Sequence, residues 1–178
     1  MSSNYSINFN TPKRSKKLIK FIIIHYTGMK SQSKAVERLC DSSSKVSAHY
    51  FIKDNGKLLN LVPDLYEAWH AGKSSWKNLK SLNKYSIGIE INNSGHDYRY
   101  PKFKKRQIST LKKLLKNLIN KYKIRNRNIL GHSDIAPDRK KDPGEKFPWK
   151  DLANKDLSIW HKLKENKIKI LRNQKLNS

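Results

Sequence analysis

Two histidines of this 178-residue sequence stand where a metal ligand would be well placed. His25 follows an apolar run at residues 18–24, and His132 follows a shorter one at residues 128–131. Two imidazoles and one carboxylate, such as Asp142, suit a catalytic zinc ion, which takes three protein ligands and leaves one position open. Spacing alone does not establish that the two histidines meet. Each of the other four histidines, taken singly, is more typical of a structural role.

Glu90 is a second residue with unusual chemistry. It lies in an apolar segment, residues 85–92, where isoleucines alternate with Gly88 and Glu90. A carboxylate in such surroundings must be paired, bound to a metal or shifted in pKa. One interpretation makes Glu90 a general base whose pKa is raised by its apolar surroundings. The alternative places it on the polar face of an edge strand.

Lys140 lies two residues before Asp142, in a proline-containing segment, residues 133–149, that shows little periodicity. Long ordered loops of this kind often carry function. If the chain is extended there, the side chains of Lys140 and Asp142 point the same way and can face one site. An ammonium group beside a metal-bound carbonyl would stabilise the oxyanion of a tetrahedral intermediate.

Strands must position these groups. Residues 21–26 are predicted to form a buried central strand, and residues 85–92 a second one. The Asn-Gly pair at residues 55–56 predicts a hairpin between residues 49–53 and 58–62.

Helices are predicted on either side of the sheet. Ser33 is expected to cap a short helix, and residues 107–122 give the clearest helical pattern, because their large apolar residues recur every three or four positions. We therefore predict an α/β fold, a single domain whose mixed central β-sheet is flanked by helices. The expected boundaries are a basic N-terminal arm (1–17), a catalytic domain (18–160) and a basic C-terminal tail (161–178).

The chain is strongly basic, with 39 Lys+Arg against 14 Asp+Glu and a formal net charge of +25. Residues 98–127 contain twelve of these cations and no acid, which indicates either a solvated helix face or a surface for an anionic partner. No nucleic-acid-binding motif accompanies the charge, so no nucleic-acid partner is expected. The single cysteine, Cys40, excludes an internal disulfide and a multi-cysteine zinc site.

Taken together, the motifs of residues 18–160 resemble the zinc-dependent N-acetylmuramoyl-L-alanine amidases of the type 2 amidase family. That fold is shared with peptidoglycan recognition proteins and some phage lysozymes. The motifs occur in the family's order: His25-Tyr26-Thr27, Val46-Ser47-Ala48-His49-Tyr50, Ala68-Trp69-His70-Ala71-Gly72, Ser86-Ile87-Gly88-Ile89-Glu90, and His132 through Pro143-Gly144. The last stretch is highly specific, because two ligand positions and the lysine lie in one loop.

The resemblance implies a role for each matching residue. It implies the zinc ligands His25, His132 and Asp142, with Glu90 as general base and Lys140 as oxyanion stabiliser. Three further residues match positions that line the substrate groove: His49, Trp69 and His70. Ala48 stands where some relatives place a catalytic tyrosine, so this chain is expected to depend on Glu90 instead.

The implied reaction is hydrolysis of the amide bond between N-acetylmuramic acid, or its 1,6-anhydro form, and L-alanine in peptidoglycan or muropeptides. The alternatives are a non-catalytic peptidoglycan-binding module and a phage-type lytic amidase. We expect a monomer without a transmembrane segment. No signal peptide is visible, so a cytoplasmic location is expected, with an envelope location as the alternative if a signal was removed.

Overall fold

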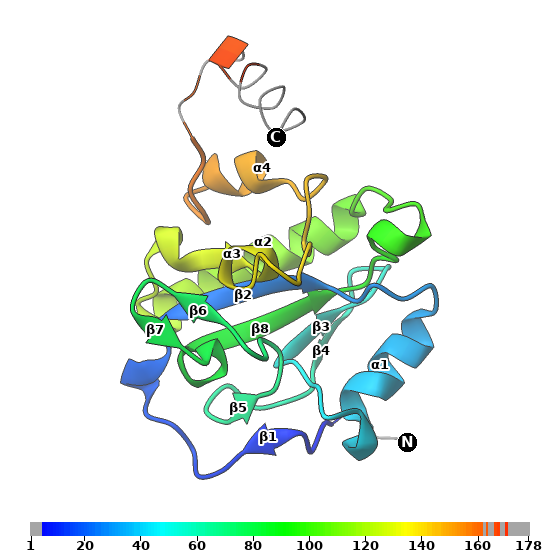
Figure 1. Cartoon of the computed structure of the whole chain (residues 1–178), viewed down its shortest axis with the longest axis vertical. Helices are drawn as coiled ribbons and strands as arrows, with labels where there is room; N and C mark the ends of the chain where they lie inside the picture. The colour runs from blue at the N-terminus through cyan, green and yellow to red at the C-terminus, as the bar shows by residue number, and fades with distance from the viewer. Residues whose placement is uncertain (1–4, 162, 164–165, 168–169, 171–178) are drawn as a thin grey trace.

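A five-stranded sheet forms the centre of the computed structural model, which describes residues 5–161, 163, 166–167 and 170 (Figure 1). Its strands, in spatial order, are β4 (Leu58–Asn60), β3 (Tyr50–Ile52), β8 (Ser86–Ile91), β2 (Phe21–Tyr26) and β9 (Ile129–Gly131). The pairs from β3 to β9 are parallel, whereas β4 runs antiparallel to β3. The predicted α/β fold with a mixed sheet is confirmed, and so are the predicted strands and the hairpin.

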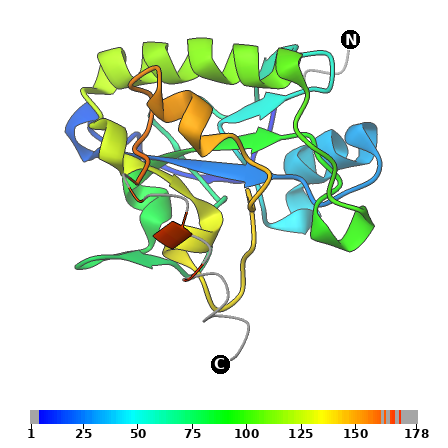
Figure 2. The same ribbon diagram turned by 90° about the horizontal axis from the view of Figure 1, so that it is seen from above.

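Two layers of helix cover the sheet. Helix α2 (Lys105–Tyr122) crosses one face together with the short α4 (Trp149–Ala153), while α1 (Gln32–Cys40) and α3 (His132–Ile135) lie on the other face (Figure 2). The predicted apolar stripe of α2 is buried against the sheet, at Ile108, Leu111, Leu115, Leu118 and Tyr122.

Strand β8 separates the two faces residue by residue. Ile87, Ile89 and Ile91 pack in the cluster that contains α2, so Gly88 and Glu90 face the opposite side of the sheet. Because β8 is hydrogen-bonded to β3 on one side and β2 on the other, it is an interior strand. The interpretation of Glu90 as the polar face of an edge strand is therefore wrong.

Small elements complete the described structure. Two-stranded pairs form between β1 (Phe9–Asn10) and β5 (Glu67–Ala68), and between β6 (Ser75–Trp76) and β7 (Leu79–Lys80). The 3-10 turns are Lys16–Leu18, Ser42–Ser44, Leu82–Tyr85, His96–Tyr98 and Asn126–Asn128.

Residues 5–17 of the basic N-terminal arm pack against the sheet domain. Besides carrying β1, this segment buries Ser6 and Asn8. The Asn8 amide donates hydrogen bonds to the carbonyls of Asp41 (2.8 Å) and Val46 (2.9 Å). The arm therefore closes the side of the domain next to α1.

Two further details differ from the sequence-based expectations. Helix α1 begins earlier than predicted, because Ser31 caps it by accepting a hydrogen bond from the Lys34 N–H at 3.3 Å, and Ser33 lies inside the helix. The segment 133–149, expected to be a loop, contains most of α3 and the first residue of α4. Most of the predicted tail, residues 161–178, lies outside the described residues. No helix in the described part of the chain combines the length and the apolar character that crossing a bilayer requires.

Candidate active site

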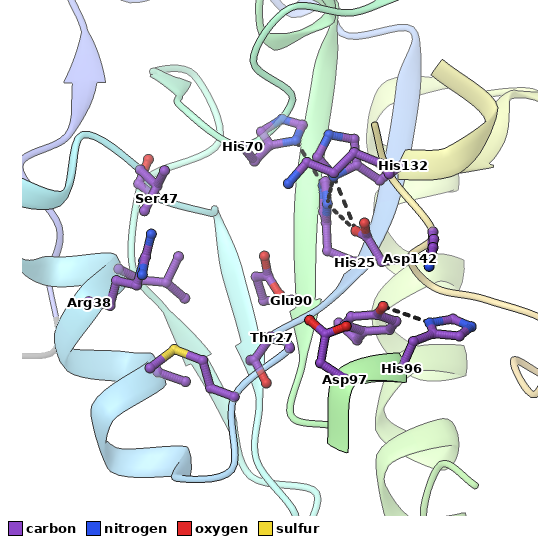
Figure 3. Close-up of a pocket in the computed structure, with 18 of the residues that line it drawn as sticks. His25, Thr27, Arg38, Ser47, His70, Glu90, His96, Asp97, His132 and Asp142 are labelled. Carbon is purple, nitrogen blue, oxygen red and sulfur yellow. Dashed lines mark hydrogen bonds and ion pairs between the residues drawn. The ribbon is translucent and has the colours of Figure 1, made fainter. Parts of the chain in front are cut away.

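A cavity of about 480 Å³ opens on the sheet face opposite α2, at the carboxyl ends of β2 and β8. Its lining brings together His25, Glu90, His132, Lys140 and Asp142, which are the five residues predicted to bind metal or act in catalysis. Figure 3 labels all of them except Lys140. Ligand sites in parallel sheets commonly lie at this end of the strands.

Three buried side chains converge in the cavity. Nδ1 of His25 lies 2.9 Å from Nδ1 of His132, and Oδ2 of Asp142 lies 3.0 Å from the first nitrogen and 3.1 Å from the second. All three residues are at most 6% exposed. Asp142 reaches His132 because the chain turns back after α3, where the Ser133 N–H donates to the Asp142 carbonyl at 2.9 Å.

This triangle fits the ligand set of a metal ion. Ligand atoms about 2.0–2.1 Å from a tetrahedral zinc ion lie about 3.3 Å from one another, close to the separations found here. The donor set of two imidazoles and one carboxylate matches catalytic zinc sites that keep one position open. Within the part of the chain that the structure describes, this is the one group of three such side chains close enough to share an ion.

The electrostatics of the cluster also favour a cation. Burial, together with the neighbouring His132, lowers the pKa of His25 to about 4, so its ring is neutral at pH 7. Burial by itself would raise the pKa of Asp142, but its contacts with the two neighbouring imidazoles, His132 and His25, hold it well below its usual range. A neutral histidine and an ionised carboxylate are the protonation states that a metal needs.

The ring of His132 is oriented by a hydrogen bond on the side that faces away from the cluster. Its Nε2 lies 3.2 Å from the carbonyl oxygen of Ala71, which can only accept, so Nε2 carries the proton and Nδ1 presents its lone pair to the cluster.

Glu90 stands next to this cluster. It is the direct partner of His25 in the β2–β8 register, so both side chains leave the same face of the sheet. Its Oε2 atom is buried and has no hydrogen-bond partner among the described residues. Burial, reinforced by the charge of Asp142, raises the pKa of Glu90 to about 8, whereas Lys140 acts in the opposite direction. A carboxyl tuned in this way can both accept and return a proton near neutral pH.

Of the three residues predicted to line the substrate groove, Trp69 and His70 do line the cavity. His49 does not: it is fully buried, with its Nδ1 accepting from the Gly88 N–H and its Nε2 donating to the Tyr66 carbonyl. Both nitrogens of His49 are therefore used in holding the fold.

Two charged cavity residues carried no sequence signal. Figure 3 shows Arg38 across the cavity from the His-His-Asp cluster, and Asp97 near its rim. Exposed, charged positions in a Lys- and Arg-rich chain look alike in the sequence. The α1 packing pattern, which buries Ala35, Val36 and Leu39, could have indicated only that Arg38 lies on the other side of that helix.

Comparison with known proteins agrees with this geometry. Residues 14–145 match the family model described as N-acetylmuramoyl-L-alanine amidase. The chain is 40% identical over 154 residues to the N-acetylmuramoyl-L-alanine amidase AmiD of Escherichia coli, covering 80% of this chain and 55% of AmiD. It is 40% identical over 105 residues to the E. coli 1,6-anhydro-N-acetylmuramyl-L-alanine amidase AmpD, covering 59% and 55%.

A solved complex is also similar. The structure of E. coli AmiD with anhydro-N-acetylmuramic acid-L-Ala-D-gamma-Glu-L-Lys superposes with a TM-score of 0.75 at 36% identity, covering 85% of this chain and 62% of that one. The chain spans about half the length of the curated relatives it matches. The family match covers well over half of the residues, and all five of the cavity residues His25, Glu90, His132, Lys140 and Asp142 fall within it. The chain therefore belongs to the N-acetylmuramoyl-L-alanine amidase family.

Proposed function

We propose that this chain is a zinc-dependent hydrolase that cleaves the amide bond between N-acetylmuramic acid, or its 1,6-anhydro form, and L-alanine. The observation that carries the proposal is the unpartnered Oε2 of Glu90 beside the buried cluster of His25, His132 and Asp142. An unsatisfied buried carboxylate destabilises a fold, and its position in a cavity next to a metal-type ligand set gives it a catalytic use.

The proposed chemistry assigns one task to each group. A zinc ion held by His25, His132 and Asp142 would supply Lewis acidity toward a carbonyl oxygen and would lower the pKa of water to about 7. Glu90 accepts the proton of the attacking water and returns it to the leaving amine, which its pKa near neutrality allows. The ammonium group of Lys140, which lines the same cavity, stabilises the negative charge that develops on the carbonyl oxygen.

The walls of the cavity suit an acidic peptide. Arg38, Arg139 and Lys141 line it in addition to Lys140. The ligand named in the AmiD complex contains a γ-linked glutamate, whose free carboxylate these cations could bind. One chain supplies every residue of the site, so we propose that the protein acts as a monomer.

Mass spectrometry of reaction products tests the proposal. The zinc-loaded chain is incubated with a soluble anhydro-muropeptide and, separately, with intact sacculi, each with and without a chelator. We expect free stem peptides that begin with L-alanine, and none when the chelator is present. Absence of these peptides with both substrates would contradict the proposal and would favour a binding module. Faster cleavage of the anhydro-muropeptide would support a cytoplasmic recycling role over a role in the envelope or in lysis.

Two kinds of variant separate metal binding from proton transfer. Replacing His25, His132 or Asp142 by Ala is expected to abolish zinc binding and hydrolysis together. Glu90→Gln keeps the size of the side chain but removes the base, so it should retain zinc and lose about 10²–10⁴-fold in turnover. Full activity of Glu90→Gln would show that another group takes the proton.

A further inference from the structure

A chain of hydrogen bonds leads from His25 back to a fixed point of the backbone. Nε2 of His25 lies 3.1 Å from Nδ1 of His70, and Nε2 of His70 lies 3.1 Å from Oγ of Ser86. The Ser86 hydroxyl also lies 2.6 Å from the carbonyl oxygen of Leu82. The participating side chains are buried, at 1% exposure for His25, 8% for His70 and none for Ser86.

The Leu82 carbonyl at the far end of this chain of hydrogen bonds determines which atom is the donor in each of them. A carbonyl oxygen can only accept, so Ser86 donates its single hydroxyl proton to Leu82. The oxygen of Ser86 then accepts from the Nε2–H of His70, which leaves Nδ1 of His70 without a proton. That nitrogen accepts from the Nε2–H of His25, so the lone pair of His25 lies on Nδ1, the atom that faces His132 and Asp142.

The fold provides a fitted place for the His70 ring. A Cβ atom on Gly88 would lie 2.3 Å from Cγ of His70, so the ring requires a glycine at this position of β8. The backbone that carries His70 is held by Asn83, whose Oδ1 accepts hydrogen bonds from the N–H groups of His70 (3.1 Å) and Ala71 (2.7 Å). The Ala71 carbonyl in turn receives the Nε2–H of His132. Two consecutive residues, His70 and Ala71, therefore contact the outer nitrogens of both cluster histidines.

From this geometry we propose that His70 is a positioning residue: it holds His25 in the tautomer whose Nδ1 can bind metal. The inference rests on the proposed metal site, but it assigns His70 a role different from contact with substrate. Outer partners of metal-binding histidines commonly take this role, and their loss costs about 10–100-fold in metal affinity.

Zinc affinity of the purified chain, measured by competition with a chromogenic chelator, tests the proposal. His70→Ala is expected to weaken zinc binding by about 10–100-fold. His70→Asn places an acceptor oxygen at the same number of bonds from the backbone as Nδ1, so it should recover a large part of that loss. Ser86→Ala should weaken binding less than His70→Ala, because His70 remains in place and loses only its orienting partner.

Ser74→Ala is the matched control. The Ser74 hydroxyl is also buried and also bonds to Leu82, by accepting its N–H at 3.1 Å, but it has no bond to either histidine. Its loss should therefore leave zinc affinity unchanged. A folded His70→Ala chain that binds zinc as tightly as the wild type would overturn the proposal, and so would equal losses in His70→Ala and Ser74→Ala.

If His70→Ala fails to fold, a measurement on the wild-type chain tests the proposed tautomers of His25 and His70 instead. Long-range ¹H–¹⁵N spectra of the metal-free protein report which ring nitrogen carries the proton. We expect Nε2–H on both His25 and His70, and a proton on Nδ1 of His70 would overturn the proposal. Neither the spectra nor the zinc titration uses a substrate, so a failure of the proposed hydrolysis would leave both results interpretable.

Discussion

At the scale of single residues, the same burial that suits Glu90 to its proposed catalytic role also affects the stability of the fold. Its pKa is raised from 4.5 to about 8, mainly by burial. In the unfolded chain Glu90 ionises near pH 4.5, whereas in the metal-free fold it keeps its proton until about pH 8. The fold therefore holds one more proton than the unfolded chain in this range, and stability falls as pH rises from 4.5 to 8. Each pH unit in that window lowers the free energy of unfolding by about 1.4 kcal/mol.

Glu90→Gln removes this dependence, because the amide does not ionise. For the metal-free chain we expect the variant to match the wild type at pH 4.5 and to exceed it by about 2 kcal/mol or more at pH 9. Urea unfolding at the two pH values measures the difference. Glu37→Gln, on the exposed side of α1, should show no such pH-dependent gain. Equal stabilities of Glu90→Gln and the wild type at pH 9 would contradict the assigned pKa.

The sequence predicted the cavity residues proposed for metal binding and catalysis better than the residues that support them. His25, Glu90 and His132 end or interrupt apolar segments, and a polar residue in such a place needs a reason. The supporting contacts involve the Ala71 carbonyl, the Asn83 side chain and the Ser86 hydroxyl, which belong to common residue types. Gly88, a glycine within a strand, was the one available sign that another side chain approaches closely there.

At the scale of elements, Asp64 connects three segments of the fold. Its carboxylate accepts hydrogen bonds from the hydroxyls of Tyr50 on β3 and Tyr122 on α2, both at 2.6 Å, and from Nζ of Lys121 at 2.7 Å. Burial would raise the pKa of Asp64, but these hydrogen bonds hold it below its usual value. This contribution to stability is complete above about pH 4 and is lost as pH falls through the lowered pKa.

Asp64→Asn is therefore expected to lower the free energy of unfolding by about 1.5–3 kcal/mol at pH 7, with the difference from the wild type narrowing below pH 4. Thermal or urea unfolding at pH 7 and pH 3 measures this. Asp151→Asn removes a more exposed ion pair with Lys112 and should change stability by less than about 1 kcal/mol at pH 7. A constant difference for Asp64→Asn at both pH values would show that packing, not charge, sets the contribution of Asp64.

Elements with strong local signals were predicted, and those made by long-range contacts were not. The hairpin has its Asn-Gly turn, and α2 has six buried apolar residues in helical spacing. By contrast, β1 and β5 have two residues each and exist because distant segments pair. Helix α3 has only four residues, too few for a helical pattern in the sequence, and it buries Ile135 in an apolar cluster made with distant segments.

At the scale of the whole molecule, the sheet separates the basic outer side of α2 from the candidate active site. The apolar side chains of β8 contact α2, whereas Glu90 faces the cavity on the other side. Within the acid-free stretch 98–127, Lys104 and Lys112 are paired with Asp54 and Asp151 from other segments. Lys104 and Lys112 therefore neutralise acids from other segments, whereas the exposed lysines of α2 lie on the face of the sheet opposite the cavity.

This separation predicts how the charge affects hydrolysis. A helix is about 10 Å across, so exposed lysines on the outer side of α2 lie more than a Debye length, about 8 Å at physiological salt, from the cavity. Replacing Lys105, Lys113 and Lys116 together by Gln should leave the rate on soluble muropeptides and on sacculi unchanged. Arg38→Gln, which removes a cation that lines the cavity, should raise KM for both substrates. A slower rate for the triple variant on sacculi alone, disappearing as salt is added, would contradict this expectation. It would mean that α2 recruits the enzyme to the polymeric wall, and would favour an envelope or lytic role over a cytoplasmic one.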